Sequence, residues 1–294
     1  MYNKVTECRN KLVKIRGAAI VGYYSTTNLG DGIYSIFEMI GVGAYLIVGD
    51  EKALLIDTGY GFGNLRKEVE KITQKPLIVV NSHLHADHCL GNSQFEEAYA
   101  AAADLPKLQG DYLHKQYDTL IGYGAKMFPA LRLLLLYAKL KRKPHYDTQY
   151  KTLAENMSFD LGGRVIRFVS LPGHTEGSVV ALDEQTQTVF AGDAINGGLF
   201  LFFDPAVQLA EYAGLLRAFA KTEGYGRLLL SHQKEPLPFS FTGWCADFLE
   251  RASLEKSEVT DFPNEGRTVY QYTENSEECG ACSVFFTAEN VSAK

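Results

Sequence analysis

The sequence has no long hydrophobic run and few cysteines. No stretch of its 294 residues contains the roughly 20 consecutive apolar residues that a membrane-spanning helix needs. The basic N-terminus is followed by an apolar run at 18–21, which is too short for the core of a signal peptide. The five cysteines are odd in number and irregularly spaced, which argues against a disulfide framework and favours a reducing compartment. These absences predict a cytoplasmic protein without a transmembrane segment.

The sequence also lacks an excess of positive charge. Its 29 basic and 35 acidic residues give a net charge of −6, whereas a general nucleic-acid binder needs a basic surface to contact phosphates. We therefore expect a small-molecule substrate and no nucleic-acid partner. With 46% apolar and 22% charged residues, the composition is that of an ordinary globular enzyme, and the length suits one large domain or two small ones.

Three histidines and one aspartate lie within six positions: His83, His85, Asp87 and His88. An apolar, β-branched run at 77–80 predicts a buried strand that ends just before them. Four side chains on a strand would divide between its two faces, but on a tight loop at the strand's end they can converge on one point. Imidazole nitrogens and carboxylate oxygens suit zinc and its neighbours. A single histidine is usually an ordinary core or surface residue, but this cluster indicates a metal site.

The chain repeats this arrangement, in which a predicted strand ends at a residue that can bind metal. Three further predicted strands are followed by His174, Asp193 and His232, respectively. Five of the seven histidines belong to the set, while His114 and His145 lie elsewhere. This segregation indicates a single site built by many strands. Apolar or alternating runs predict these strands at 33–38, 44–48, 53–56, 77–80, 165–170, 179–182, 188–191 and 227–231.

Asp57 stands at the end of the predicted strand at 53–56, one strand and one helix before the histidine cluster. A metal-bound histidine usually donates its other N–H to a carboxylate or a carbonyl, so Asp57 is a candidate for that supporting role. The alternative is that Asp57 caps the N-terminus of the following helix, predicted at 64–73. Another helix is predicted at 206–221.

The segment 94–156 is rich in Ala, Leu and Tyr and predicts several helices. Its apolar residues at 127–140 nearly encircle the helix axis, which favours a buried helix. The basic end of this run leaves a membrane-surface helix as an alternative. We interpret the segment as a helical insertion packed on the core, and a lid over the metal site is one version of that interpretation. In the tail, two alternating runs at 268–272 and 283–287 predict a closing hairpin.

Cys279 and Cys282 form a C-x-x-C motif in this tail. Such a pair binds metal or performs redox chemistry in some proteins, but no second cysteine pair accompanies it here. We interpret the two residues as thiols in a C-terminal turn.

The set of motifs resembles the metallo-β-lactamase-fold hydrolases, and it follows that family's order over about residues 33–235. The resemblance implies an α/β fold, a four-layer αβ/βα sandwich with helices outside and metals at one edge. Residues 1–294 would then be a single domain with a helical insertion at 94–156 and a C-terminal hairpin at 257–294. The matching segments are Leu55-Ile56-Asp57-Thr58-Gly59, His83-x-His85-x-Asp87-His88, Gly173-His174-Thr175-x-Gly177, Gly192-Asp193 and Ser231-His232.

The resemblance also implies two divalent metal ions, zinc in the first place, with iron or manganese as alternatives. One metal would be held by His83, His85 and His174, the other by Asp87, His88 and His232, with Asp193 as a bridge between them. A water molecule between two such cations loses its proton near neutral pH and attacks a carbonyl or a phosphorus. The metals stabilise the oxyanion that develops, and Asp87 is expected to take or give a proton.

Departures from the family pattern narrow the function. Many β-lactamases of the fold carry Cys or Ser at the position of Asp193, whereas the Asp form resembles the glyoxalase-II, lactonase and nuclease branches. Flavo-diiron relatives have Glu at the position of His85, which disfavours that branch. The expected reaction is hydrolysis of a small ester, thioester or lactone. The alternatives are a phosphodiesterase, a sulfur dioxygenase with one iron, and a fold member that only binds.

The segment 197–203 follows directly after Asp193 and contains two glycines and three phenylalanines. A chain that leaves Asp193 must begin close to the metals, so this segment and the insertion at 112–136 are predicted to line an apolar pocket. Phe200 and Phe202, which alternate on an extended segment, are the predicted lining residues. The alternative is that all three phenylalanines enter the core.

Overall fold

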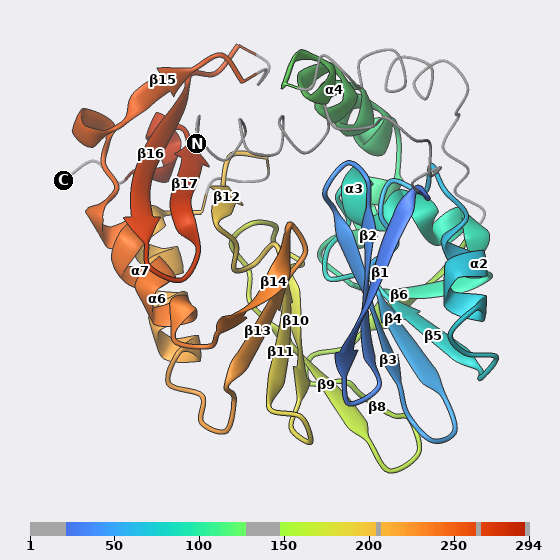
Figure 1. Ribbon diagram of the computed structural model, residues 1–294. Coiled ribbons are helices and arrows are strands. Elements are labelled where there is room, and N and C mark those ends of the chain that lie inside the picture. Colours follow the sequence, from blue (N-terminus) through green and yellow to red (C-terminus); the bar gives the residue numbers. More distant parts are fainter. Residues whose placement is uncertain (1–21, 128–147, 204–206, 263–265, 292–294) are drawn as a thin grey trace, which may run out of the picture.

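The computed structural model describes residues 22–127, 148–203, 207–262 and 266–291. Within them, two large sheets face each other, and a smaller third sheet lies beside one of them (Figure 1). The first sheet has the strand order β1-β2-β3-β4-β5-β6-β7. Its strands are β1 (Tyr24–Gly30), β2 (Ile33–Glu38), β3 (Gly43–Val48), β4 (Ala53–Ile56), β5 (Leu77–Val80), β6 (Glu97–Ala101) and β7 (Gln149–Leu153).

The second sheet has the strand order β14-β13-β11-β10-β9-β8. Its strands are β8 (Ser158–Asp160), β9 (Val165–Ser170), β10 (Val179–Asp183), β11 (Thr188–Gly192), β13 (Arg227–Leu230) and β14 (Gln233–Pro238). The third sheet has the order β12-β17-β16-β15. It consists of β12 (Gly198–Phe200), β15 (Glu258–Thr260), β16 (Val269–Ser276) and β17 (Gly280–Phe286).

Helices cover the outer faces of the two large sheets, with α2 on the first sheet and α6 and α7 on the second (Figure 1). Among the helices of the described residues, none combines the length and the apolar character that a membrane crossing requires. The helices are α2 (Leu65–Glu70), α3 (Ala86–Cys89), α4 (Tyr112–Met127), α6 (Leu209–Phe219) and α7 (Phe241–Arg251). Short 3-10 turns lie at η1 (Leu90–Gln94), η2 (Leu105–Leu108), η4 (Leu254–Lys256) and η5 (Ala288–Asn290).

The central strands of both sheets, such as β3, β4, β10 and β11, are buried on both faces, which explains their nearly continuous apolar sequences. In β4, Leu54 faces the core between the sheets, whereas Leu55 packs against α2. In β10, Ala181 faces the same central core, whereas Val180 and Leu182 pack against α6 and α7. This alternation produces a helix–sheet–sheet–helix sandwich, as predicted.

Parallel strand pairs bring the chemistry-bearing loops to one edge of the sandwich. β4 runs parallel to β5 in the first sheet, and β11 runs parallel to β13 in the second. The carboxyl ends of parallel neighbours lie at the same edge, so the loops after these four strands emerge together. The loops carry Asp57, the histidine motif, Asp193 and His232, in that order.

The prediction of several helices in residues 94–156 is wrong in part, because β6 and β7 lie in this segment and extend the first sheet. The alanines of β6 favour helices intrinsically, but pairing with β5 and β7 overrides that preference. The helix that does occur, α4, packs Leu113, Tyr117 and Ile121 against the region of α3. Most of the apolar run at 127–140 lies outside the described residues, as does His145.

The two alternating runs in the tail form the antiparallel hairpin β16–β17. The third sheet joins this hairpin to the loop after Asp193, because β12 pairs in parallel with β17. The tail therefore lies beside the metal-type residues rather than at a remote end of the molecule.

Candidate metal centre

The histidine motif lies on the turn that follows β5 and on the single helical turn α3, which begins at Ala86. All four of its predicted metal ligands are buried, with exposed fractions between 0% for His88 and 9% for Asp87. The chain bends at Ser82 and His83 and becomes helical at Ala86, so the histidine side chains do not alternate as they would on a strand. The predicted convergence on one point therefore has a simple backbone cause.

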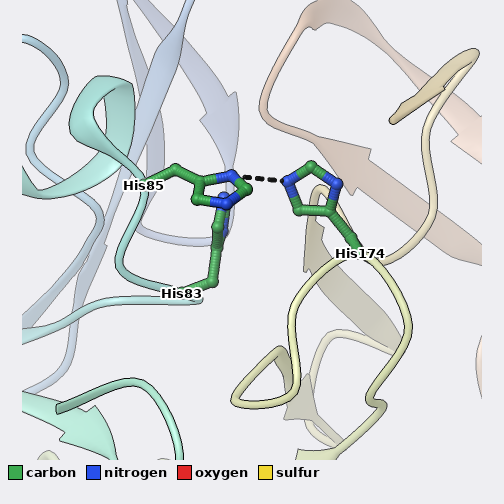
Figure 2. A group of neighbouring side chains, drawn as sticks. All are labelled: His83, His85 and His174. Carbon is green, nitrogen blue, oxygen red and sulfur yellow. Dashed lines mark hydrogen bonds between the residues drawn. The ribbon is translucent and has the colours of Figure 1, made fainter. Parts of the chain in front are cut away.

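His83, His85 and His174 form the first group, in which the candidate ligand atoms lie within 4.8 Å of one another. Figure 2 shows His83 and His85 on one loop and His174 on the opposite loop, with their rings facing. His85 Nδ1 and His174 Nε2 are 2.9 Å apart. His174 comes from the second sheet, so this group joins the two halves of the sandwich.

Asp87, His88 and His232 form the second group, and their candidate ligand atoms also lie within 4.8 Å of one another. The Oδ2 atom of Asp87 lies 3.6 Å from Nε2 of both His88 and His232. His232 is the most open of the predicted ligands, with 33% of its side chain exposed. Substrate and solvent can therefore reach the centre from the side of His232.

Asp193 lies between the two groups. Its Oδ2 atom is 3.7 Å from Nε2 of His174, 3.5 Å from Nε2 of His88 and 3.2 Å from Nε2 of His232. Its other oxygen, Oδ1, accepts a hydrogen bond from Asn196 Nδ2 at 3.1 Å. Asn196 thus orients the carboxylate so that Oδ2 faces both groups.

Asp57 fixes the orientation of two of the imidazoles. Its Oδ2 lies 2.9 Å from His88 Nδ1 and accepts the hydroxyl of Ser82 at 2.7 Å, while its Oδ1 accepts the Ser82 backbone N–H at 2.8 Å. Because a carboxylate only accepts, His88 Nδ1 carries a proton, and Nε2 is the nitrogen left for a metal ion. Ser82 Oγ in turn lies 3.1 Å from His83 Nδ1, and it accepts there because its own proton goes to Asp57. Both rings therefore present Nε2 to the centre.

The backbone of Asp57 is in the left-handed region, with φ = 62°. Non-glycine residues rarely adopt this conformation outside Asn and Asp, and such strain clusters at functional sites. The helix that follows is capped by Asn64, not by Asp57. The interpretation of Asp57 as a helix cap is therefore wrong.

The buried imidazole nitrogens fit a cation. Nε2 of His83, His85 and His88 has no hydrogen-bond partner in the described part of the chain, although each atom is buried. An unpartnered buried polar atom costs about 1–3 kcal/mol, so three in one cluster are unfavourable unless something binds them. His174 Nδ1 donates to the carbonyl of Phe200 at 2.7 Å, so its Nε2, which lies 2.9 Å from His85 Nδ1, carries a lone pair.

The charges of the centre also suit metal binding. Burial, helped by the neighbouring histidines, lowers the pKa of His83 and His85 well below the usual range, and burial lowers that of His174. These three rings are thus neutral, as ligands must be. Burial alone would raise the pKa of Asp193, but His232 and His88 hold it well below its usual range. Burial would lower the pKa of His88, but Asp87, Asp193 and Asp57 raise it, so this position strongly favours positive charge.

Two polar residues that the sequence analysis missed support the centre from behind. The carboxylate of Asp104, which is fully buried, accepts hydrogen bonds from the backbone of Leu84 and Gly177 and from the hydroxyl of Thr175. Gln116 of α4 accepts the backbone N–H of Ala86 at 2.6 Å. Neither residue belongs to a recognisable motif. What distinguishes them is that a carboxylate and an amide are buried, which the sequence does not reveal.

The aromatic segment after β12 divides between core and site. Phe202 is 0% exposed and packs with Phe262 and Phe285, so the prediction that it lines a pocket is wrong. Phe200 is half-buried and stacks on Phe285, with ring centroids 4.4 Å apart. Phe203 is half-buried, and its ring centroid lies 5.3 Å from that of His85. Phe203 therefore places an aromatic ring beside the centre.

A family model described as the metallo-beta-lactamase superfamily matches residues 41–233, well over half of the chain. The chain belongs to the metallo-beta-lactamase superfamily. The acyl-coenzyme A thioesterase MBLAC2 of Homo sapiens is 25% identical over 223 residues, which cover 65% of this chain and 74% of that protein. The protein of the same name from Gallus gallus is 24% identical over 220 residues, 65% of this chain and 72% of its own length. Superfamily membership and these similarities identify the chain as a hydrolase.

Solved structures of the superfamily share the fold. The DIM-1 metallo-beta-lactamase aligns with a TM-score of 0.53 at 16% identity and covers 78% of this chain and 98% of its own. An archaeal superfamily protein from Sulfolobus tokodaii gives a TM-score of 0.53 at 17% identity, over 80% of this chain and 92% of its own. The predicted family and sandwich architecture are thus confirmed.

Proposed function

We propose that this chain hydrolyses a thioester with two divalent metal ions, zinc in the first place, and that an acyl-coenzyme A is the substrate class to test first. The observation that supports a thioester is the similarity to acyl-coenzyme A thioesterases over 65% of the chain. The chain carries the residues that such a reaction needs, since each of the two groups offers three ligand atoms and Asp193 lies between them. The proposed location is the cytoplasm.

Each predicted ligand has a role in this proposal. His83, His85 and His174 would hold one cation, Asp87, His88 and His232 would hold the other, and Asp193 would contribute to both. When bound, the cations supply Lewis-acid polarisation of the substrate carbonyl and lower the pKa of a water molecule. Asp57 holds His88 directly, and His83 through Ser82, in the tautomer that exposes Nε2.

Asp87 is the proposed proton carrier of the reaction. Its side chain is 13% exposed, so it reaches the solvent side of the centre while its Oδ2 lies 3.6 Å from two imidazoles. A carboxylate in that place can accept a proton during attack and give it to the departing thiolate. Phe203, beside His85, offers an apolar surface to the acyl group.

A substrate panel tests the proposal. The zinc-loaded protein is assayed with acyl-coenzyme A thioesters of several chain lengths, a simple ester, a lactone and an activated phosphodiester, and oxygen uptake is followed with the iron-loaded protein and a persulfide. We expect the thioester to have the highest kcat/KM and its turnover to vanish in the metal-free protein. Preference for the phosphodiester would make the chain a phosphodiesterase. Oxygen consumption that requires iron would make it a sulfur dioxygenase.

A further inference from the structure

Cys279 and Cys282 lie together beside the metal centre, although they are far from it in sequence. Both belong to the β16–β17 hairpin: Cys279 lies in its turn, and Cys282 lies on β17 opposite Glu274. The backbone at Gly280 between them has φ = 77°, a turn conformation that brings the two residues back toward each other. Cys279 is half-buried and Cys282 is 1% exposed.

The two thiols lie close to each other, because both sulfurs lie near the position that a Cβ would take on Gly197. A hydrogen bond with Cys279, together with burial, raises the pKa of the Cys282 thiol well above its usual range. Both sulfurs also pack on the same residue: a Cβ added at Gly197 would lie 2.7 Å from Cys279 Sγ and 3.7 Å from Cys282 Sγ. A glycine at 197 is what leaves room for the pair. Two thiols this close to each other need only a short movement to form a disulfide.

The thiol pair touches the segments that carry two predicted ligands. Cys279 Sγ donates to Gln233 Oε1 at 3.0 Å, and Gln233 directly follows His232. Gly197 directly follows Asn196, which holds Asp193. The backbone carbonyl of Gly197 accepts the N–H of Ser283, the residue after Cys282, at 2.8 Å.

We propose that Cys279 and Cys282 are a redox-active dithiol that closes to a disulfide and thereby loosens metal binding at the neighbouring centre. The oxidant is a small organic disulfide. The more accessible Cys279 attacks one of its sulfurs, so that a mixed disulfide forms and one small thiol leaves. The thiol of Cys282 then attacks Cys279 Sγ, and the second small thiol leaves with the remaining proton. The net reaction converts two protein thiols and one small disulfide into one protein disulfide and two small thiols.

The coupling to the metal centre follows from the lost proton. A disulfide has no S–H, so Gln233 Oε1 loses the donor that holds it, and the start of β14 beside His232 is less restrained. The sulfurs must also move relative to Gly197, which has no side chain to absorb the shift and which adjoins Asn196. We therefore expect faster metal loss from the group that contains His232. In a reducing compartment such a disulfide is transient, as in other intracellular redox sensors.

Thiol mapping tests the disulfide. The metal-loaded full-length protein is incubated with oxidised glutathione, its free thiols are alkylated, and peptides are analysed by mass spectrometry. We expect one disulfide that joins Cys279 to Cys282, and reversal by dithiothreitol. Cys282→Ser should accumulate a stable glutathione adduct on Cys279. In Cys279→Ser, Cys282 should form neither a protein disulfide nor a glutathione adduct. Cys245→Ser, a buried cysteine in the same core, is the matched control and should behave as the wild type. A disulfide to another cysteine, or two freely alkylated thiols, would overturn the proposal.

Metal release tests the coupling and does not depend on the substrate. Zinc transfer to a chromogenic chelator is timed for the reduced and the oxidised protein. We expect at least a several-fold faster release of one of the two ions after oxidation, and no change when Cys279→Ser receives the same treatment. Identical release from reduced and oxidised wild type would reject the coupling.

Discussion

The carboxylate of Asp104 accepts a hydrogen bond from the backbone N–H of Leu84 at 2.8 Å, between two histidines of the metal motif. The same carboxylate accepts the N–H of Gly177 and the hydroxyl of Thr175, both at 3.0 Å, on the loop that carries His174. Asp104 therefore ties the two ligand-bearing loops of the first metal group to each other from behind.

Replacement of Asp104 is expected to weaken metal binding. Asp104→Asn keeps the shape but leaves one or two buried donors unpaired, at about 1–3 kcal/mol each. We expect a lower melting temperature and, at a temperature where the variant is folded, roughly 10–100-fold weaker zinc binding. Chelator competition and thermal unfolding measure the two effects. Asp111→Asn, whose side chain is 68% exposed, is the control. Unchanged zinc affinity in a folded Asp104→Asn protein would reduce Asp104 to a purely structural residue.

Asp57→Asn should also weaken metal binding, but with little loss of fold. Asn tolerates the left-handed φ of 62°, so the backbone is preserved. Its amide has one acceptor oxygen instead of two, so it cannot accept both the Ser82 backbone N–H, which goes to Oδ1, and the Ser82 hydroxyl and His88 Nδ1, which go to Oδ2. We expect a roughly 10–100-fold loss of zinc affinity or of kcat, as is typical for a carboxylate behind a ligating histidine. Asp31→Asn is the matched control, because the exposed Asp31 has φ = 51° and lies away from the centre. Equal behaviour of the two variants would refute the role of Asp57.

Much of the sandwich could be predicted because its central strands are buried on both faces and have apolar sequences. The bounds predicted from the sequence for β2, β4, β5 and β9 are those of the structure. The metal-type residues could be found because each follows a predicted strand. β6 could not be predicted, since its alanines favour helices and only the neighbouring strands make it extended. Asp104 could not be predicted either, because what distinguishes it is burial between two loops, and those loops meet only in the folded chain.

The purified protein is expected to bind about two divalent ions per chain, as the two ligand groups imply. His174→Ala should lower the stoichiometry to about one by emptying the first group, while Asp193→Asn should weaken both ions because Asp193 touches both groups. Elemental analysis after zinc supplementation measures the metal, and circular dichroism confirms the fold. Both variants should lose thioester hydrolysis. A wild-type stoichiometry well below one, or a variant with near-normal turnover, would contradict the assignment.

Stability should depend on pH through Glu38, which is 3% exposed. Burial raises its pKa to about 8, although the N–H groups of Tyr60 and Gly61 oppose the shift. An unfolded glutamate has a pKa of about 4.3, so between these values only the folded state holds the proton. A rise in pH therefore destabilises the fold, by on the order of a few kcal/mol between about pH 4.5 and pH 8.

Glu38→Gln imitates the protonated side chain and should remove this dependence. Urea unfolding at pH 5 and pH 8.5 measures the free energy of unfolding of both proteins. We expect the variant to be similar to the wild type at pH 5 and more stable at pH 8.5. Groups that titrate equally in both proteins cancel in this comparison. Glu70→Gln, on the exposed side of α2, is the control. A constant difference between wild type and Glu38→Gln at the two pH values would show that Glu38 is ionised in the folded state at both.

Phe203 is expected to recognise the apolar part of the substrate, because its half-buried ring lies 5.3 Å from that of His85. Phe203→Ala removes apolar surface worth roughly 1.5–3 kcal/mol when a ligand covers it. We expect KM to rise about tenfold or more for long acyl thioesters and hardly at all for acetyl thioesters, with kcat and metal content preserved. Phe219→Ala is the matched control, since Phe219 is equally half-buried but lies at the end of α6, on the outer face of the second sheet. Phe202→Ala, in the core, should instead lower stability by about 3–5 kcal/mol without chain-length selectivity. If Phe203→Ala raised KM equally for short and long acyl chains, the ring would support the position of His85 rather than bind the acyl group.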